Sequence, residues 1–366
     1  MSDVLIFGDS GSAYLRHEIP LSLPDPTAYV EKDGKRFAIG GSLDLPRLEA
    51  LGGYEVLSFE ELGLDEVLAG GATLAEGLQE CLLRACRRIG VADAVVPPDF
   101  PVRAADFLRA GGVELRPDAA LFDGRRRSKT PEQIAGIRRA QKVAELAMES
   151  VRSGLRDGGE LTSEKLRAGA KRVFVDNGCL PHEMLLLSCG PQSALIHDEG
   201  TGPIRPHEPI LVDIFPRDAA SGCWGDITRT FCVGEPPAEL GDYHRNVREA
   251  QLRACETVRP GISAGEPYRA ACEVLEAAGY ATRRTKGEGE VLEDGFAHYL
   301  GHGLGLDLHE APTLDEGGEI LVPGDVITIE PGLYRRGFGG CRIEDVLLVT
   351  EDGYELLTSF PYELAP

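Results

Sequence analysis

Four apolar segments of this 366-residue chain each carry an acidic residue where a strand pattern calls for a hydrophobic one. These residues are Asp213 in ILVDIF, Asp226 at the start of DITRTF, Glu330 at the end of VITIE and Glu344 in RIEDVLLV. An ionised carboxylate is very costly to bury without a partner, and neighbouring carboxylates raise one another's pKa. The four segments can therefore fold together as buried strands only if something positive offsets the acidic groups.

Each carboxylate also has a simpler interpretation. It could lie at a strand end facing water, or pair with a nearby arginine such as Arg229 or Arg342. This interpretation explains a single carboxylate well. It does not explain why four separate strands break the apolar pattern in the same way. Divalent cations would remove both the burial cost and the repulsion, and two cations held close together can activate water and polarise a carbonyl group.

A histidine-rich segment offers the nitrogen ligand that such a site would need. The stretch FAHYLGHGLGLDLHE, residues 296–310, contains His298, His302 and His309, three of the eight histidines of the chain. A single histidine is most often a structural residue, but three within twelve positions favour a metal or acid–base site. Two Asp, two Glu and one His suffice to hold two cations, and this oxygen-rich set suits Mn²⁺, Co²⁺ or Zn²⁺.

The length of the chain and its pattern of elements predict two domains. The first part alternates short strands, such as 4–7 and 37–40, with helices such as 73–89, which is typical of an α/β domain. The polar, basic segment FDGRRRSK at 122–129 marks the boundary, and Thr130-Pro131-Glu132-Gln133 then forms a capping box that starts a long helix. We therefore predict domains at 1–125 and 126–366.

Strands and helices of the second domain are grouped rather than alternating, which favours an α+β domain with an antiparallel or mixed sheet. The expected helices lie near 163–177, 242–258 and 263–278, and the expected strands at 185–189, 210–215, 226–233, 326–330, 343–350 and 355–357.

Composition limits the partners and the compartment. The formal net charge of −22 disfavours binding to nucleic acid or to anionic membranes. No apolar run approaches the length of a membrane span, no secretory signal is recognisable, and the nine cysteines contain no C-x-x-C pair. These features predict a cytoplasmic protein that does not bind membranes.

Four motifs in order resemble those of the pita-bread metallopeptidases, and most closely those of prolidase and aminopeptidase P. The motifs are Asp213…Asp226-Ile-Thr-Arg-Thr, Gly301-His302-Gly303…His309-Glu310-Ala311-Pro312, Thr328-Ile329-Glu330-Pro331-Gly332 and Arg342-Ile343-Glu344-Asp345. The resemblance extends over the whole chain. It implies an α/β creatinase-like N-terminal domain followed by an α+β pita-bread catalytic domain.

The resemblance also implies roles for individual residues. It implies that a dinuclear metal centre is held by Asp213, Asp226, His302, Glu330 and Glu344. We expect the two ions to be Mn²⁺, with Co²⁺ or Zn²⁺ as alternatives. Glu330 would also act as general base, and the catalytic histidines would be His197, His298 and His309. Arg342 and Tyr334 would orient a metal carboxylate. The family further implies short proline-containing peptides as substrates and a homodimer.

Two departures from the family pattern leave alternatives open. The interval from Asp213 to Asp226 is longer than usual, with Phe215 in place of a glycine, so Asp218 is a weaker competitor as a ligand. Where some dipeptide-specific members have an arginine, this chain has Thr313, and Arg335 and Arg336 are candidates to replace it.

We expect an Xaa-Pro dipeptidase, with an aminopeptidase P acting on longer peptides as the close alternative. A non-catalytic pita-bread binding module, or a creatinase-like amidinohydrolase that uses no metal, would not need all five ligands.

Overall fold

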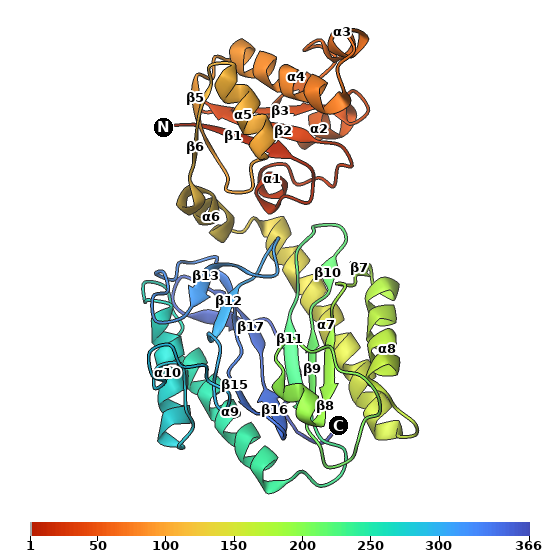
Figure 1. The fold of residues 1–366 in the computed structure, drawn as a ribbon, viewed down its shortest axis with the longest axis vertical. Helices are drawn as coiled ribbons and strands as arrows, with labels where there is room; N and C mark the ends of the chain where they lie inside the picture. Colours follow the sequence, from red (N-terminus) through yellow and green to blue (C-terminus); the bar gives the residue numbers. More distant parts are fainter. Residues whose placement is uncertain (1) are drawn as a thin grey trace. The chain divides into compact units, whose positions relative to one another are not determined.

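The computed structural model describes residues 2–366, and the chain divides into two compact units, Met1–Arg126 and Arg127–Pro366. Both units are built from sheets with helices packed against them (Figure 1). The first unit is α/β and the second is α+β, as the order and grouping of the elements predicted.

A six-stranded mixed sheet in the order β4-β3-β2-β1-β5-β6 forms the centre of the first unit. Its strands are β1 (Asp3–Gly8), β2 (Thr27–Lys32), β3 (Lys35–Gly40), β4 (Glu55–Ser58), β5 (Asp93–Val96) and β6 (Glu114–Pro117). The β1–β2 and β2–β3 pairs are antiparallel, and the outer pairs are parallel. The predicted strands at 4–7 and 37–40 are β1 and β3, whereas β2 and β4 were not predicted.

Both faces of this sheet are buried because successive side chains of a strand point to opposite sides. Leu5 of β1 packs in the core beneath α4 and α5, whereas Val4 and Ile6 pack in the core on the other face. The helices are α1 (Ala13–Glu18), α2 (Leu45–Leu51), α3 (Leu64–Ala69), α4 (Leu74–Ile89), α5 (Val102–Ala110) and α6 (Ala119–Arg127).

The segment 122–129, predicted to mark the domain boundary, is not irregular throughout. Its first part belongs to α6, and Phe122 is 2% exposed within the core of the first unit. The helix was not predicted because its sequence is rich in arginine and few of its residues are buried.

The second unit begins with the helix that the capping box predicted. Thr130 accepts a hydrogen bond from the Gln133 N–H, and the Gln133 side chain accepts one from the Thr130 N–H, at the start of α7 (Pro131–Asp157). Helices α7 and α8 (Ser163–Asp176) pack on an antiparallel sheet in the order β11-β9-β8. The strands of this half are β7 (Cys179–Leu180), β8 (Leu186–Cys189), β9 (Ile210–Ile214), β10 (Arg217–Asp218) and β11 (Ile227–Phe231), with a 3-10 turn at Gly190–Ala194.

The other half of the second unit is also a sheet covered by two helices. Helices α9 (Ala238–Thr257) and α10 (Gly265–Ala277) share one core with the strands beside them. A five-stranded sheet in the order β13-β12-β14-β17-β18 and the hairpin β15–β16 complete it. The bounds are β12 (Gly301–Gly303), β13 (Glu310–Leu314), β14 (Val326–Ile329), β15 (Gly332–Arg335), β16 (Gly339–Arg342), β17 (Asp345–Val349) and β18 (Tyr354–Leu356).

The two halves of the second unit meet along β11. The Glu344 N–H donates to the Thr228 carbonyl (3.1 Å), and the Thr230 hydroxyl donates to the Arg342 carbonyl (3.1 Å). The turn between β16 and β17 is thereby fixed beside β11, which brings two of the sequence-predicted acidic residues from distant parts of the chain toward one another.

Candidate metal centre

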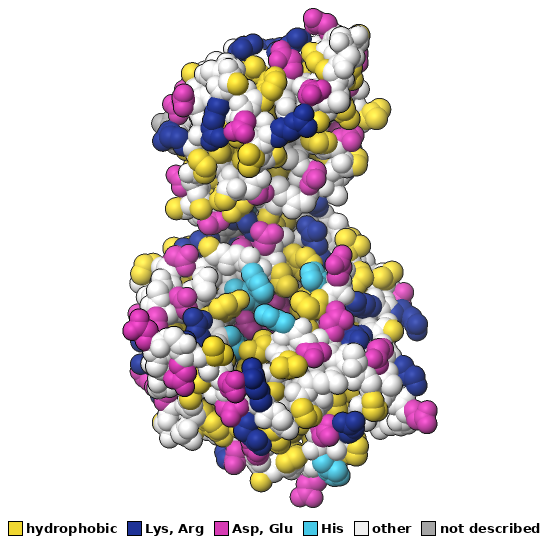
Figure 2. Space-filling view, viewed as in Figure 1, with side chains coloured by type: hydrophobic (Ala, Val, Ile, Leu, Met, Phe, Trp, Pro, Cys, Tyr) yellow, Lys and Arg dark blue, Asp and Glu magenta, His cyan; other side chains and the backbone are white. Residues whose placement is uncertain are grey.

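The structure brings all five predicted ligands to one cavity of about 220 Å³ in the second unit. They come from separate parts of the chain: Asp213 lies in β9 and His302 in β12, Asp226 directly precedes β11, Glu330 directly follows β14, and Glu344 lies in the turn before β17. Figure 2 shows histidine side chains around a hollow in this unit, with acidic side chains at its floor.

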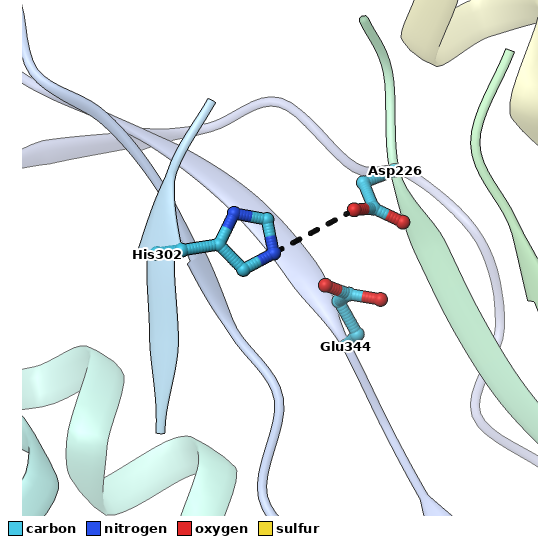
Figure 3. Close-up of side chains that lie close together, drawn as sticks. All are labelled: Asp226, His302 and Glu344. Carbon is cyan, nitrogen blue, oxygen red and sulfur yellow. Dashed lines mark ion pairs between the residues drawn. The ribbon is translucent and has the colours of Figure 1, made fainter. Parts of the chain in front are cut away.

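Three of these side chains form the tightest group. The ligand atoms of Asp226, His302 and Glu344 all lie within 4.8 Å of one another (Figure 3). The His302 Nε2 atom is 3.8 Å from Asp226 Oδ2 and 3.6 Å from Glu330 Oε1. Distances of this kind are too long for hydrogen bonds and leave room for an ion between the groups.

The protonation state of His302 suits a metal ligand. Its Nδ1 lies 3.0 Å from the Gly303 carbonyl, which can only accept, so Nδ1 carries the proton and Nε2 presents a lone pair. Burial lowers the pKa of this imidazole to about 3, so it is neutral at physiological pH. Gly301 and Gly303 on either side are required because a Cβ there would overlap the backbone of Thr328 or Ala311.

The carboxylates repel one another, and two of their oxygens have no hydrogen-bond donor in the described part of the chain. Burial, followed by the charges of Glu344 and Asp213, raises the pKa of Asp226 well above its usual value. Burial and Glu344 raise the pKa of Glu330 in the same way. Among the residues that the structure describes, Asp213 Oδ1 and Asp226 Oδ1 are buried oxygens without a hydrogen-bond donor. Buried polar atoms of this kind are rare, and the donor set therefore fits divalent cations.

The backbone of Asp226 is held by α7. The Gln141 side chain accepts a hydrogen bond from the Asp226 N–H (2.9 Å) and donates one to the Asp226 carbonyl (2.9 Å). Gly225 permits this approach, because a Cβ at that position would lie 2.5 Å from the backbone nitrogen of Gln141. The long helix thus fixes where β11 begins and where the Asp226 side chain stands.

Arg342 and Tyr334 link Asp213 to one of the predicted histidines. The Arg342 guanidinium pairs with Asp213 Oδ2 and donates to the Tyr334 hydroxyl (3.2 Å), which lies 3.0 Å from His298 Nε2. His298 Nδ1 donates to the Tyr299 carbonyl (2.7 Å), so Nε2 accepts from Tyr334. Both ring nitrogens of His298 are therefore engaged by the protein.

Glu344 is fixed from the opposite side. Its carboxylate accepts a hydrogen bond from the Thr228 hydroxyl (2.8 Å), and its carbonyl accepts one from Arg229 (2.7 Å). Arg229 is fully buried and also pairs with Asp345 (2.8 Å). Glu344 thus has a rigid backbone, and burial together with Asp213 raises its pKa to about 8.

The other two predicted histidines also line the cavity. His309 lies with its ring centroid 4.1 Å from that of His302, and burial lowers its pKa. His197 follows the 3-10 turn and lines the same space.

The weaker alternatives lie elsewhere. Asp218 pairs with Arg139 (3.0 Å) and accepts hydrogen bonds from Ser221, and it does not line the cavity. Arg335 pairs with Glu239, and Arg336 pairs with Glu293. Neither arginine lines the cavity, so neither takes the place of the arginine that some dipeptide-specific members have at the position of Thr313.

Several lining residues were not predicted. They are His182, Met184, Leu186, Ile196, Phe215, Tyr299 and Leu308. Most are apolar, and an apolar side chain that lines a cavity has the same sequence signal as one in the core.

Carboxylates and histidines from both halves of the second unit line one cavity. This arrangement is typical of metal-dependent hydrolases. Comparison with known proteins identifies the family. Residues 135–351, more than half of the chain, match the model of metallopeptidase family M24, and the chain belongs to this family. It is therefore a metallopeptidase, and family membership implies divalent metal binding.

Similar proteins agree with this assignment. The probable dipeptidase PepE of Mycobacterium tuberculosis is 31% identical over 304 residues, covering 82% of this chain and 72% of the relative. The Xaa-Pro dipeptidase of Pyrococcus furiosus is 34% identical over 240 residues, covering 64% of each.

Among solved structures, the prolidase from Pyrococcus horikoshii OT3 superposes with a TM-score of 0.81 at 24% identity, over 100% of this chain and 95% of the other. The dipeptidase PepE from Mycobacterium ulcerans gives 0.75 at 25% identity, over 100% and 92%. These matches confirm the resemblance to the pita-bread metallopeptidases and the fold that it implied. Within residues 2–366, no helix combines the length and apolarity that crossing a membrane requires.

Proposed function

We propose that this metallopeptidase is an Xaa-Pro dipeptidase, which hydrolyses the bond before proline in dipeptides. The observation that carries the proposal is the convergence of the five proposed ligand side chains, four of them buried, on one small cavity, with an unpaired oxygen on each of two of them. The names of the relatives, which include dipeptidases and Xaa-Pro dipeptidases, supply the substrate class.

The proposed centre holds two divalent cations, with Mn²⁺ as the first candidate. The ligands would be Asp213, Asp226, His302, Glu330 and Glu344. When bound, such cations would polarise the scissile carbonyl and lower the pKa of a water molecule. Their charge would also return the acidic side chains to the ionised state that burial opposes.

The protein's own groups have separate tasks. Glu330 is proposed to accept the proton of the attacking water and to deliver it to the proline nitrogen, which leaves as a secondary amine. His309 and His197 are proposed to bind the substrate and stabilise charge on its carbonyl oxygen. His298 has both nitrogens engaged, so its proposed contribution is through Tyr334 and Arg342, which hold Asp213 in place.

One observation favours a second candidate, an aminopeptidase P that releases the residue before proline from longer peptides. Thr313 stands where some dipeptide-specific members have an arginine, and Arg335 and Arg336 do not line the cavity. The presence of all five ligands argues against a non-catalytic binding module or a creatinase-like amidinohydrolase.

The remaining expectations complete the proposal. The domains at 1–125 and 126–366 are proposed as a creatinase-like N-terminal domain and the catalytic domain. We further propose a cytoplasmic homodimer, with no role in binding nucleic acid.

A substrate and metal panel tests the proposed function. The protein is stripped with chelator, reloaded with Mn²⁺, Co²⁺ or Zn²⁺, and assayed on Ala-Pro, Ala-Pro-Ala and Ala-Ala, with metal content measured by mass spectrometry. Metal-dependent cleavage that is faster for Ala-Pro than for Ala-Pro-Ala supports a dipeptidase. Faster cleavage of the tripeptide would favour the aminopeptidase, and a protein that binds no divalent metal would contradict both.

A further inference from the structure

Part of the cavity lining belongs neither to the proposed ligands nor to the catalytic histidines. It consists of the apolar side chains of Met184, Leu186, Ile196, Phe215 and Leu308, here called the apolar wall, together with Tyr299 and His182. Neither the metal ligation nor the proposed acid–base chemistry uses His182. Its position on the cavity wall therefore calls for a separate explanation.

The His182 ring is held in a fixed orientation. It packs edge-on against Phe215, with ring centroids 5.3 Å apart, and against Trp224, at 5.6 Å. Trp224 is itself anchored, because its Nε1 donates to the Leu306 carbonyl (3.2 Å). A ring held by two aromatic neighbours loses little further freedom when it binds a ligand, which favours affinity.

The backbone also sets which nitrogen of His182 carries the proton. The Met184 N–H lies 3.1 Å from Nδ1 and can only donate, so Nδ1 holds the lone pair. The Met184 carbonyl is 3.2 Å from the same nitrogen and would accept from Nδ1 only in the other tautomer. The tautomer that accepts from the Met184 N–H carries its proton on Nε2, which is then the donor left for a ligand.

A dipeptide substrate needs a donor of this kind. Its C-terminal carboxylate enters a cavity lined by four acidic side chains, where an anion without a hydrogen-bond donor is strongly disfavoured. Arg342 is the only arginine among the described residues that line the cavity, and it is paired with Asp213. The Arg217 guanidinium lies 5.6 Å from the centre of the Trp224 ring, but Arg217 does not line the cavity.

We propose that His182 is a specificity-determining residue whose Nε2–H binds the terminal carboxylate of a dipeptide, with the proline ring against the apolar wall. This inference rests on the proposed function and takes it further. The imidazole N–H of His182 takes the place of the missing arginine as hydrogen-bond donor, and the chain thereby selects a free carboxylate over a continuing peptide.

A comparison of two substrates in one preparation tests the proposal. The ratio of kcat/KM for Ala-Pro to that for its C-terminal amide, Ala-Pro-NH₂, is measured for the wild type and for His182→Phe. Phenylalanine keeps the contacts with Phe215 and Trp224 but has no N–H. Because both substrates are assayed on the same preparation, the ratio does not depend on the fraction of protein that is folded or loaded with metal.

The wild type should favour the free acid, and His182→Phe should reduce the ratio by roughly 10- to 100-fold, as for a lost hydrogen bond to a charged group. His182→Gln, which retains an N–H donor, should keep more of the preference than His182→Phe. His207→Asn serves as a matched control, because His207 is exposed and bonds to the Glu235 carbonyl away from the cavity. Its ratio should equal that of the wild type.

The outcomes separate the two proposals. A wild type that cleaves neither substrate would overturn the dipeptidase function and this inference with it. A wild type that cleaves Ala-Pro, together with a His182→Phe variant that keeps the wild-type ratio, would overturn the inference alone. An equal loss in His182→Phe and His207→Asn would do the same.

Discussion

Replacing Glu344 by glutamine in the metal-free protein should reduce the pH dependence of its stability. Burial and the nearby Asp213 raise the pKa of Glu344 from 4.5 to about 8. Near neutral pH the folded, metal-free protein therefore keeps a proton on this carboxyl group, whereas the unfolded chain has released it. The folded state binds more protons, so its free energy of unfolding falls as the pH rises from about 4.5 to 8.

The size of the effect follows from the same two values. Their difference corresponds to about 5 kcal/mol of destabilisation, absent below pH 4.5 and complete above pH 8. Glu344 is 2% exposed, so solvent does little to screen it. Glutamine has nearly the same shape, carries no charge at any pH and can still accept the hydrogen bond from Thr228. The variant should lose up to this amount of pH dependence, and Asp226 and Glu330 should supply the slope that remains.

Urea unfolding in chelator at pH 5 and pH 8 measures the difference. Trp224 is the only tryptophan and lies in the second unit, so its fluorescence reports on the unit that contains the site. The free energy of unfolding should fall between the two pH values more steeply for the wild type than for Glu344→Gln. Parallel behaviour of the two proteins would refute the reasoning, because it would mean that Glu344 is not held protonated by its surroundings.

Three further substitutions probe different parts of the site. Asp226→Ala should abolish turnover and halve the metal content measured by mass spectrometry, with an unchanged circular dichroism spectrum; full turnover would refute its role as a ligand. Gln141→Leu removes both hydrogen bonds to the Asp226 backbone, so it should destabilise the protein by about 2–4 kcal/mol in urea and weaken metal binding in calorimetry. Tyr334→Phe removes the hydroxyl between Arg342 and His298, and kcat should fall about 10-fold with metal content preserved. Normal kcat in this variant would show that the hydrogen-bonded chain has no catalytic consequence.

The four acidic residues proposed as ligands could be singled out in the sequence because each breaks a local pattern. A carboxylate in an otherwise apolar strand is visible within five or six residues, as for Asp213 in ILVDIF, and this signal requires no knowledge of the partner strands. The start of α7 was predictable for the same reason, since the capping box of Thr130 and Gln133 is complete within four residues. The β2–β3 hairpin also has a local signal, the Asp33-Gly34 pair, whose φ angles of 49° and 76° are those of a tight hairpin turn.

The packing around His182 could not be predicted in this way. His182 is far in the sequence from Phe215 and Trp224, and the three rings meet because β9 and β11 pair and because the segment before β8 lies beside them. No short window contains that information. A lone histidine such as His182 has the sequence signal of an ordinary surface residue, and its importance depends on the tertiary packing around it.

The five proposed ligands are held in place by two different kinds of contact. Arg342 neutralises Asp213 from within the fold, and its guanidinium is fixed by Tyr334. Asp226, His302 and Glu344 lie within 4.8 Å of one another, and their ion-pair partners in the described chain include no lysine or arginine. Gln141, Thr228 and Arg229 instead hold the backbone and oxygens of Asp226 and Glu344 with hydrogen bonds that leave their charge in place. The repulsion that destabilises this half of the site without metal is therefore relieved when a cation binds, so metal affinity and the instability of the metal-free protein arise from one arrangement of charges.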